Sequence, residues 1–536
     1  MKKFRWQLLI IFLTGIVVGV LLLAEQPNII NPVGPTPSRG GIYSEALIGE
    51  LQRLNPVLDH YNPVDRDVNH FIFSGLIKFD SRGVPQPDLA DSWGISKDGK
   101  VYNFSLRQNA TFHDGQPVTA DDVDFTIAMM KDPGSILPED IKSFWSEIEV
   151  ISLSETSIQF RLPEPFAPFL DYLTFGILPK HLFGGMSYDE MVDSPLNLQP
   201  VGSGPYQFDQ LLVDDGKING IILKTYENYY LTPPYIEQII FRYYPDEYTA
   251  LEAYRDGKVL GISRVSQDIL NEVLAEPGLS LYSGRLPALS IILFNLENPE
   301  KEFFQNVELR KALLQGLNRQ LLIDRNLNGQ AIIADGVIFP GTWAYYDGIS
   351  KTEFDTQKAI DRLAAQNYIL AGDDSGIRVK EDARLEFNLI YPDDALHQSI
   401  AEDIKKDWQS LGVGVTLEPL PYDVLVNERL VERNYEAALI DINQSRSPDP
   451  DPYPFWDQAQ ASGGQNYSQW DNRIASEYIE QARIITDLAE RARLYRNFQV
   501  VFSENLPALP LYYPIYNYAI DNQVLGVRMG PLYDTD

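Results

Sequence analysis

The chain has 536 residues, of which 44% are hydrophobic, 12% aromatic and 22% charged. This length predicts several domains, and the apolar content excludes a mostly disordered protein. Its 44 basic and 75 acidic residues give a formal net charge of −31, which opposes binding to the phosphate backbone of nucleic acid. The absence of cysteine excludes disulfides, thiolate metal sites, a cysteine nucleophile and a lipid attached to an N-terminal cysteine.

The N-terminus carries a candidate membrane segment. An uncharged run from Gln7 to Ala24 follows three basic residues, and at about 1.5 Å per residue it would form roughly 27 Å of helix, close to the thickness of a bilayer core. We favour an uncleaved anchor whose basic flank stays in the cytoplasm. A cleaved signal peptide over residues 1–24 is the alternative, although cleavage after Ala24 would place Leu22 where a small residue is usual. The proline-rich residues 25–39 are typical of an extended tether.

Residues 112–126 carry the densest local structure signals of the chain. Before them, residues 101–106 alternate apolar and polar side chains, which predicts a half-buried strand, and Asp114-Gly115 predicts a turn. Thr119 can cap a following helix, and Asp122, at the third helical position, can reach back to the Thr119 amide. These signals alone predict a scaffold rather than a catalytic element.

Further elements are predicted along the chain, which shows no repeat of fixed period. Strands are expected at residues 221–226 and 239–244. Three helical faces are expected to pack into cores. The last belongs to a helical region that begins near Arg473 and starts again at Asp487, where Asp487 and Glu490 form a capping box. These faces are Leu309, Leu313, Leu317 and Leu321; Ile400, Ile404, Trp408 and Leu411; and Leu494, Phe498 and Phe502. The mixture predicts α/β or α+β domains.

Taken with residues 73–77, 87–93 and 202–206, the segment 112–126 resembles the opening signature of the family 5 extracellular solute-binding proteins, the large receptors of peptide, nickel and oligosaccharide ABC importers. Further matching motifs occur at residues 449–453 and elsewhere, so the resemblance covers nearly the whole chain from Gly41 to the C-terminus. It implies an α/β, two-lobed periplasmic-binding-protein-like fold with discontinuous lobes and an inserted small α+β domain. Here one N-terminal hydrophobic helix would precede that fold.

The resemblance also implies a division of the chain. Residues 1–24 would be the signal anchor or signal peptide and residues 25–39 the tether. The segments expected to form the folded part are 40–84, 199–290 and 504–536 for discontinuous lobe I, 85–198 for the inserted domain and 291–503 for lobe II.

Signals for enzyme chemistry are weak. No two of the five histidines form a metal-binding pair, and the sequence lacks HExxH, GxSxG and GxxxxGK[ST] motifs. Residues 202–205, Gly-Ser-Gly-Pro, could expose a serine nucleophile, but a tight hinge or strand entry is the stronger interpretation. We therefore expect no enzyme activity, no metal and no cofactor.

Residues 441–456 form the richest polar and aromatic segment. Four prolines stiffen it, which lowers the entropy cost of ligand contact. Its candidate ligand-binding residues are Asp441, Asn443, Arg446, Asp449 and Trp456, and a proline-braced surface turn is the alternative.

The resemblance places this segment in the ligand cleft. Peptide-binding members hold the terminal amine of the peptide with an Asp three positions before an Asp-Pro pair, and counting back from Asp449 gives Arg446. An Arg would repel an ammonium group and suits a carboxylate or sugar hydroxyls. If the alignment is gapped, Asp441 takes the amine-binding role.

Other candidate ligand-binding residues lie outside this segment. The resemblance places Trp343 and Tyr345 in an aromatic part of lobe II, with Asn466 and Tyr467 and the early Asn55 at the cleft. Trp343 is the best candidate for stacking on a ligand. The alternatives are a buried Trp whose indole N–H bonds to backbone, and a simple turn at Asn55.

The resemblance implies an extracytoplasmic receptor that captures an oligopeptide or another small hydrophilic solute between two closing lobes and delivers it to an ABC permease and ATPase complex. We expect a monomer in the periplasm or at the cell surface, tethered to the membrane through residues 7–24, not lipidated, and without a nucleic-acid partner. A secreted or anchored hydrolase on the same scaffold and a sensory or chaperone-like binding protein are the alternatives.

Overall fold

The computed structural model describes residues 38–529 apart from 382, 445 and 446. The predicted anchor at residues 7–24 and the tether up to residue 37 lie outside these described residues. In the part of the chain that is described, no helix is both long and apolar enough to span a bilayer.

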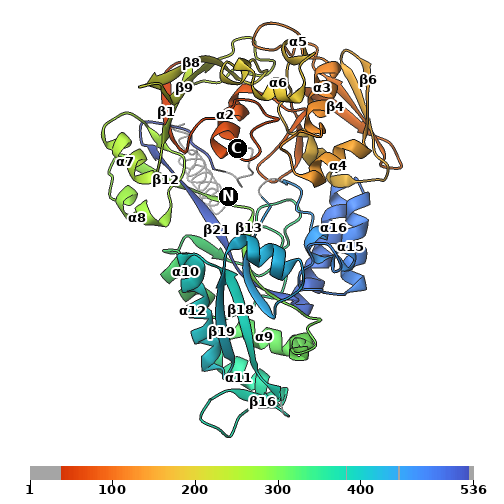
Figure 1. Cartoon of the computed structure of the whole chain (residues 1–536), viewed down its shortest axis with the longest axis vertical. Coiled ribbons are helices and arrows are strands. Elements are labelled where there is room, and N and C mark those ends of the chain that lie inside the picture. The colour runs from red at the N-terminus through yellow and green to blue at the C-terminus, as the bar shows by residue number, and fades with distance from the viewer. Residues whose placement is uncertain (1–37, 382, 445–446, 530–536) are drawn as a thin grey trace, which may run out of the picture. The chain divides into compact units, whose positions relative to one another are not determined.

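A sheet of 12 strands organises the described chain, and one strand, β21 (Ala508–Asp521), runs through its middle (Figure 1). The C-terminal half of β21 pairs with β12 and β11, and β1 and β10 continue the sheet in parallel with β11. We call these strands the first sheet region. Its members are β1 (Ile42–Ile48), β8 (Tyr206–Asp214), β9 (Lys217–Thr225), β10 (Gln238–Tyr244), β11 (Gly261–Ile262) and β12 (Leu279–Arg285).

The N-terminal half of β21 belongs to a second sheet region. There it pairs with β13 and β14, and β13 leads on to β20, β18 and β19, of which the last three are mutually parallel. The members are β13 (Ala288–Phe294), β14 (Ala331–Ile333), β18 (Glu386–Pro392), β19 (Gly414–Leu420) and β20 (Ala437–Asn443). Among the described residues, two chain segments pass directly between the regions inside the sheet, the β12 to β13 connection and β21 itself.

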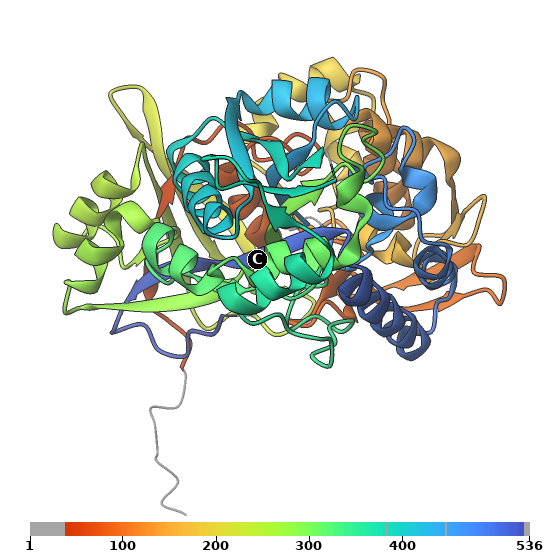
Figure 2. The ribbon, with the colours of Figure 1, turned by 90° about the horizontal axis from the view of Figure 1, so that it is seen from below.

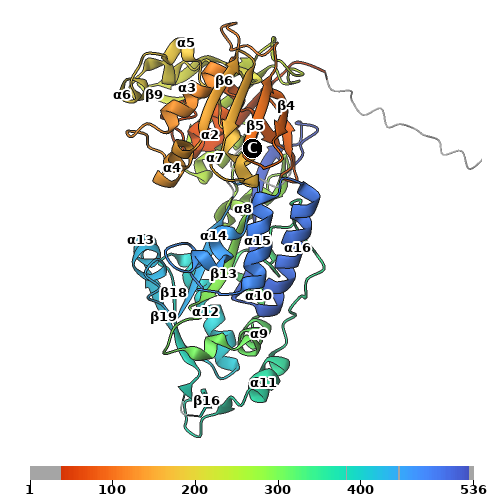
Figure 3. The same cartoon turned by 90° about the vertical axis from the view of Figure 1, so that its right-hand side faces the viewer.

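A separate four-stranded antiparallel sheet forms from the chain between residues 90 and 161. Its order is β4 (Ala90–Ile95), β5 (Val101–Leu106), β7 (Ser157–Arg161) and β6 (Glu149–Ser154). Helices α3 (Ala120–Met130) and α4 (Glu139–Glu147) lie beside it (Figure 3). Smaller pairings join β2 (Ile77–Phe79) to β3 (Pro85–Pro87), and β16 (Arg378–Lys380) to β15 (Ile369–Leu370) and β17 (Ala383–Arg384).

Helices cover these sheets. In the first half of the chain they are α2 (Pro63–Ile72), α5 (Lys180–Phe183), α6 (Tyr188–Val192), α7 (Glu247–Arg255) and α8 (Gln267–Leu274). In the second half they are α9 (Val307–Gln315), α10 (Arg319–Asn326), α11 (Thr356–Ala365), α12 (Ala395–Ser410), α13 (Tyr422–Val424), α14 (Tyr453–Trp456), α15 (Arg473–Ile484) and α16 (Leu488–Asn505). Figure 2 shows α15 and α16, in blue, side by side.

Separate hydrophobic cores accompany the two sheet regions. One core gathers side chains from Leu289 to Tyr513, on the second sheet region and its helices. Another joins the first sheet region to the four-stranded sheet, from Tyr43 through Trp145 to Phe241. A smaller one lies under α7 and α8. This division, with a core for each region, is the packing expected of two lobes.

Most local predictions are confirmed. The predicted strand at 101–106 is β5, and α3 begins directly after Thr119, whose backbone N–H donates to the Asp122 carboxylate at 2.8 Å. The strands predicted at 221–226 and 239–244 lie within β9 and β10, with Tyr226 just beyond the end of β9. The faces at Ile400 to Leu411 and Leu494 to Phe502 are buried.

One helical face is predicted wrongly at its end. Leu309, Leu313 and Leu317 are buried, but Leu321 is 39% exposed. The chain is not one helix here: α9 ends at Gln315, and Asn318 begins α10 by accepting the Leu321 N–H. The break rotates Leu321 away from the buried face.

The predicted capping box at Asp487 is confirmed in one of its two bonds. Asp487 accepts the Glu490 N–H, but the Glu490 carboxylate pairs with Arg493.

Candidate ligand-binding site

The candidate segment begins at the end of β20, where Asp441 and Asn443 are exposed. β18 and β20 are parallel, so their carboxyl ends meet at one edge of the second sheet region. In open α/β sheets this edge is the common position of ligand sites. α12 starts close to the end of β18, which brings its first turn to the same edge.

A histidine lies between two carboxylates at this edge. His397 Nδ1 is 2.6 Å from Asp394 Oδ2, and His397 Nε2 is 3.3 Å from Asp441 Oδ2. The side chains of both aspartates are 49% exposed, whereas that of His397 is 11% exposed. Burial lowers the pKa of His397, but the carboxylates of Asp441 and Asp394 outweigh it and raise that pKa overall. The edge therefore offers two half-exposed acidic groups held in place by one ring.

The next part of the segment is fixed by buried charges. Asp449 receives two hydrogen bonds from the Arg491 guanidinium, at 2.5 and 2.9 Å, and both side chains are buried. The Asp449 N–H donates to Asp171 Oδ2 at 2.8 Å, and the Ser447 hydroxyl donates to the same oxygen at 2.7 Å. Burial, and next the neighbouring charge of Asp449, raise the pKa of Asp171. Asp449 thus anchors the segment through a charge-assisted pair.

The aromatic candidates Trp343 and Tyr345 are half-buried. Trp343 lies under the Arg491 guanidinium, 5.0 Å from the ring centroid, and 5.6 Å from the ring of Tyr495. Its backbone N–H donates to the Arg82 carbonyl at 2.9 Å. Trp343 therefore adjoins the Asp449–Arg491 pair, and Tyr345 follows two residues later.

Other predicted site residues are engaged in local packing. Trp456 is buried with its ring edge against Phe502. The Asn466 amide donates to the carbonyls of Asp457 and Trp470 and accepts from the Ser468 hydroxyl and the Trp470 N–H.

Three candidates remain, of which Tyr467 packs against the same core as Trp456. Tyr467 is half-buried, and the Arg433 guanidinium lies over its ring, 4.9 Å from the ring centroid. Asn55 is fully buried and donates to Asn197 at 3.0 Å, far from the segment in sequence. Arg446 lies outside the described residues.

Four residues of this arrangement were not predicted from the sequence as site residues: Asp171, Asp394, His397 and Arg491. One signal for Arg491 was present, because it lies three positions before Leu494 and seven before Phe498, on the apolar face of α16. A charge on a buried face needs a partner. Among the described residues, no cluster of three or more His, Asp or Glu side chains is arranged to hold a metal ion.

Residues 202–205 are structural in the described chain. A Cβ on Gly202 would lie 2.0 Å from the Ile72 carbonyl oxygen, so only glycine fits beside α2. The Gly202 N–H donates to His113 Nδ1 at 3.2 Å, and His113 Nε2 lies 3.1 Å from the Gly204 carbonyl oxygen. Two of the segments that carry the family resemblance, 112–126 and 202–206, therefore contact each other directly.

Comparison with known proteins agrees with this architecture. The family described as bacterial extracellular solute-binding proteins, family 5 Middle, matches residues 84–465. The oligopeptide-binding protein AppA of Bacillus subtilis (strain 168) is 25% identical over 509 residues, covering 93% of this chain and 91% of that protein. The nickel-binding periplasmic protein of Escherichia coli (strain K12) is 28% identical over 383 residues, covering 68% of each chain.

A solved structure shares the fold over almost the whole chain. HbpA2 from Haemophilus parasuis superposes with a TM-score of 0.79 at 22% identity, covering 90% of this chain and 96% of that one. The fold is thus that of the two-lobed periplasmic binding proteins. The chain belongs to family 5 of the bacterial extracellular solute-binding proteins, the substrate-binding components of ABC importers.

Proposed function

We propose that this protein captures an oligopeptide or another small hydrophilic solute between its two lobes and delivers it to a membrane permease. The observation that carries the proposal is the acidic edge at Asp394, His397 and Asp441, where two half-exposed carboxylates lie at the carboxyl ends of β18 and β20. Ligand contacts made by both lobes would stabilise a closed state that the permease recognises. In this proposal the protein binds and releases its ligand without chemical change.

Roles for the candidate residues follow from their exposure. Asp441 and Asn443 are placed for direct contact, with Trp343, Tyr345 and Tyr467 as aromatic walls. The buried Asp449, Trp456, Asn466 and Asn55 would act by holding the backbone that carries the site. The lobe boundaries at residues 84, 198, 290 and 503 belong to the same proposal, as do a monomeric state and tethering through residues 7–24.

The chain is similar to both peptide-binding and nickel-binding proteins, so the solute has to be inferred from the chemistry of the site. An acidic edge favours a ligand with a protonated amine, so Asp441 is our choice for the group that holds a peptide amino terminus. The similarity to an oligopeptide-binding and a dipeptide-binding protein supports a peptide.

The proposal is tested by mass spectrometry of ligand retained through purification, followed by calorimetry with peptides that carry a free or an acetylated amino terminus. We expect free peptides to bind, acetylated ones to bind about tenfold more weakly, and Asp441→Asn to remove the difference. Asp423→Asn, an exposed carboxylate on α13, is the control and should bind as the unchanged protein does. The proposal fails if peptides, sugars and other solutes all leave the heat of mixing and the radius of gyration unchanged.

The alternatives have separate outcomes. Turnover of a bound peptide or sugar, abolished by a carboxylate substitution, would establish a hydrolase. Solute binding by a protein that never associates with a permease would favour a sensory or chaperone-like role.

A further inference from the structure

A cavity distinct from the acidic edge lies where the chain around α4 meets α14 and α15. It has a volume of about 680 Å³, within the range of small-molecule sites. One wall comes from residues between Asp140 and Tyr172, and the other from Tyr453 and residues between Glu480 and Ile484. None of the predicted ligand-binding residues that the structure describes lines it.

Aromatic rings form much of the lining. Phe144, Phe166, Tyr172 and Tyr453 are all half-buried and face the cavity. Phe144 stacks on Tyr172 with ring centroids 4.0 Å apart and an angle of 29° between the planes, and it meets Phe166 at 5.8 Å. Rings held in this way present flat π-faces to a ligand, and such faces attract cations.

The charge around the rings is negative. Asp140, Glu147 and Glu164 line the cavity and are exposed, and among the described residues none of the three has an ion-pair partner. Glu480 also lines it and pairs with Arg473 at 3.1 Å. An anionic ligand would therefore be repelled, and a cation attracted.

One cationic side chain shares the cavity, and its charge is already matched. Arg483 Nε lies 2.9 Å from the buried carboxylate of Asp451. The Arg483 guanidinium also lies over the rings of Tyr453, at 4.0 Å, and Phe166, at 4.9 Å. Arg483 thus already makes, in the same cavity, the cation–π contact that a cationic ligand would make.

We propose that this cavity binds a small solute that carries a protonated amine on an aromatic body. The aromatic body would pack among Phe144, Phe166 and Tyr172, and the ammonium group would lie toward Glu147 and Glu164. Because the two walls come from separate parts of the chain, such a ligand would also join α4 to α15. The inference does not depend on the proposed function of the acidic edge, because the two sites share no residue.

The probe is tryptamine, measured by calorimetry near neutral pH and low salt against tryptophol, its uncharged analogue, and indole-3-acetate, its anionic one. We expect saturable binding of tryptamine, with both analogues at least about tenfold weaker. The double variant E147Q/E164Q should lose most of that preference, and Phe144→Ala should weaken all three probes. Glu155→Gln, an exposed carboxylate outside the cavity, should behave as the unchanged protein does.

The Glu→Gln changes are on exposed side chains, so they keep the test valid if Phe144→Ala fails to fold. Equal binding of the three probes, absence of saturable tryptamine binding, or full tryptamine affinity in the double variant would each overturn the inference. Asp441→Asn separates the two sites: it should leave tryptamine binding unchanged, and loss of binding in that variant would assign the amine to the acidic edge.

Discussion

A single histidine joins two of the segments that carry the family resemblance, 112–126 and 202–206. His113 Nδ1 accepts the Gly202 N–H, which leaves the proton of the neutral ring on Nε2, beside the Gly204 carbonyl oxygen. The backbone N–H of His113 also donates to the Gly202 carbonyl at 2.8 Å. Burial lowers the pKa of His113 to about 4, because the charged ring would be poorly solvated, and this outweighs the opposing effects of the Gly204 carbonyl and Asp114.

The lowered pKa predicts that acid destabilises this junction. Between about pH 6.5 and pH 4 the unfolded chain binds a proton at His113 that the folded chain excludes, so the free energy of unfolding falls as the pH falls through this window. Urea denaturation across that window is the measurement. His113→Gln, which cannot titrate, should unfold more easily near neutral pH and show a shallower pH dependence. Parallel curves for the two proteins would contradict the assignment.

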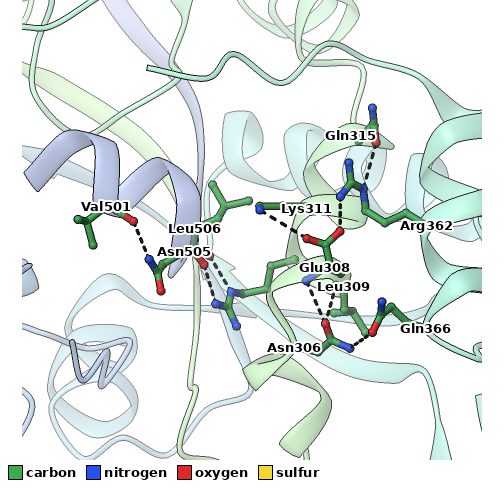
Figure 4. Close-up of polar contacts among 11 residues, drawn as sticks. Asn306, Glu308, Leu309, Lys311, Gln315, Arg362, Gln366, Val501, Asn505 and Leu506 are labelled. Carbon is green, nitrogen blue, oxygen red and sulfur yellow. Dashed lines mark hydrogen bonds and ion pairs between the residues drawn. The ribbon is translucent and has the colours of Figure 1, made fainter. Parts of the chain in front are cut away.

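At the scale of elements, a buried arginine closes the end of the longest helix described. α16 ends at Asn505, and Leu506 takes a left-handed conformation with φ of 47°. Arg310 of α9 donates to the Leu506 and Asn505 carbonyls, each at 2.7 Å, and also to the Phe304 carbonyl. Figure 4 shows Asn505 and Leu506 beside the start of α9, where Asn306 and Glu308 bond to Gln366 and Arg362. The guanidinium thus satisfies helix-end carbonyls that burial hides from water.

Removing that guanidinium should be costly. We expect Arg310→Met to lower the free energy of unfolding by about 3 kcal/mol, because it leaves buried carbonyls without donors. Arg493→Met removes an exposed arginine of α16 that pairs with Glu490 across one turn, and it should cost less than about 0.5 kcal/mol. Chemical denaturation of both variants provides the comparison. Equal losses would show that the Arg310 hydrogen bonds contribute little.

Local signals predicted the elements better than their ends. The alternation at 101–106 and the Thr119 and Asp122 pair were sufficient because strand and cap depend on neighbours in sequence. The prediction for Leu321 was wrong because the spacing of four between leucines continues from α9 into α10, although the helix breaks between them. The break depends on Asn318, whose side chain caps α10 and whose N–H donates to Asp407 of α12 at 2.8 Å. That second contact spans 89 positions, beyond any local pattern.

At the scale of the whole molecule, Asp171 fixes the candidate segment to the chain that carries the four-stranded sheet. Asp171 receives hydrogen bonds from Ser447 and Asp449, which are 276 and 278 positions away in sequence. The prolines around Asp449 predict a rigid segment, but no local pattern pairs Asp449 with Arg491 or Asp171, since only the fold brings them together. The resemblance supplied the two lobes, and periodicity alone did not.

Loss of this contact should loosen the candidate segment. Asp171→Ala is expected to speed amide exchange in residues 447–456 by roughly tenfold or more, because two of the bonds that position the backbone disappear. Asp193→Ala, an exposed carboxylate after α6, is the matched change and should leave exchange in that segment as it was. Hydrogen exchange followed by mass spectrometry distinguishes the two. Unaltered exchange in Asp171→Ala would mean that the Asp449 and Arg491 pair holds the segment without help.

β21 has a consequence for how the protein is made. It lies at residues 508–521, yet it pairs with β13 and β14 on one side of the molecule and with β11 and β12 on the other. A nascent chain that has not yet released this strand from the ribosome lacks a central member of both sheet regions. Neither region can be completed during synthesis of the preceding residues, so the stable fold forms only after this last strand has been made.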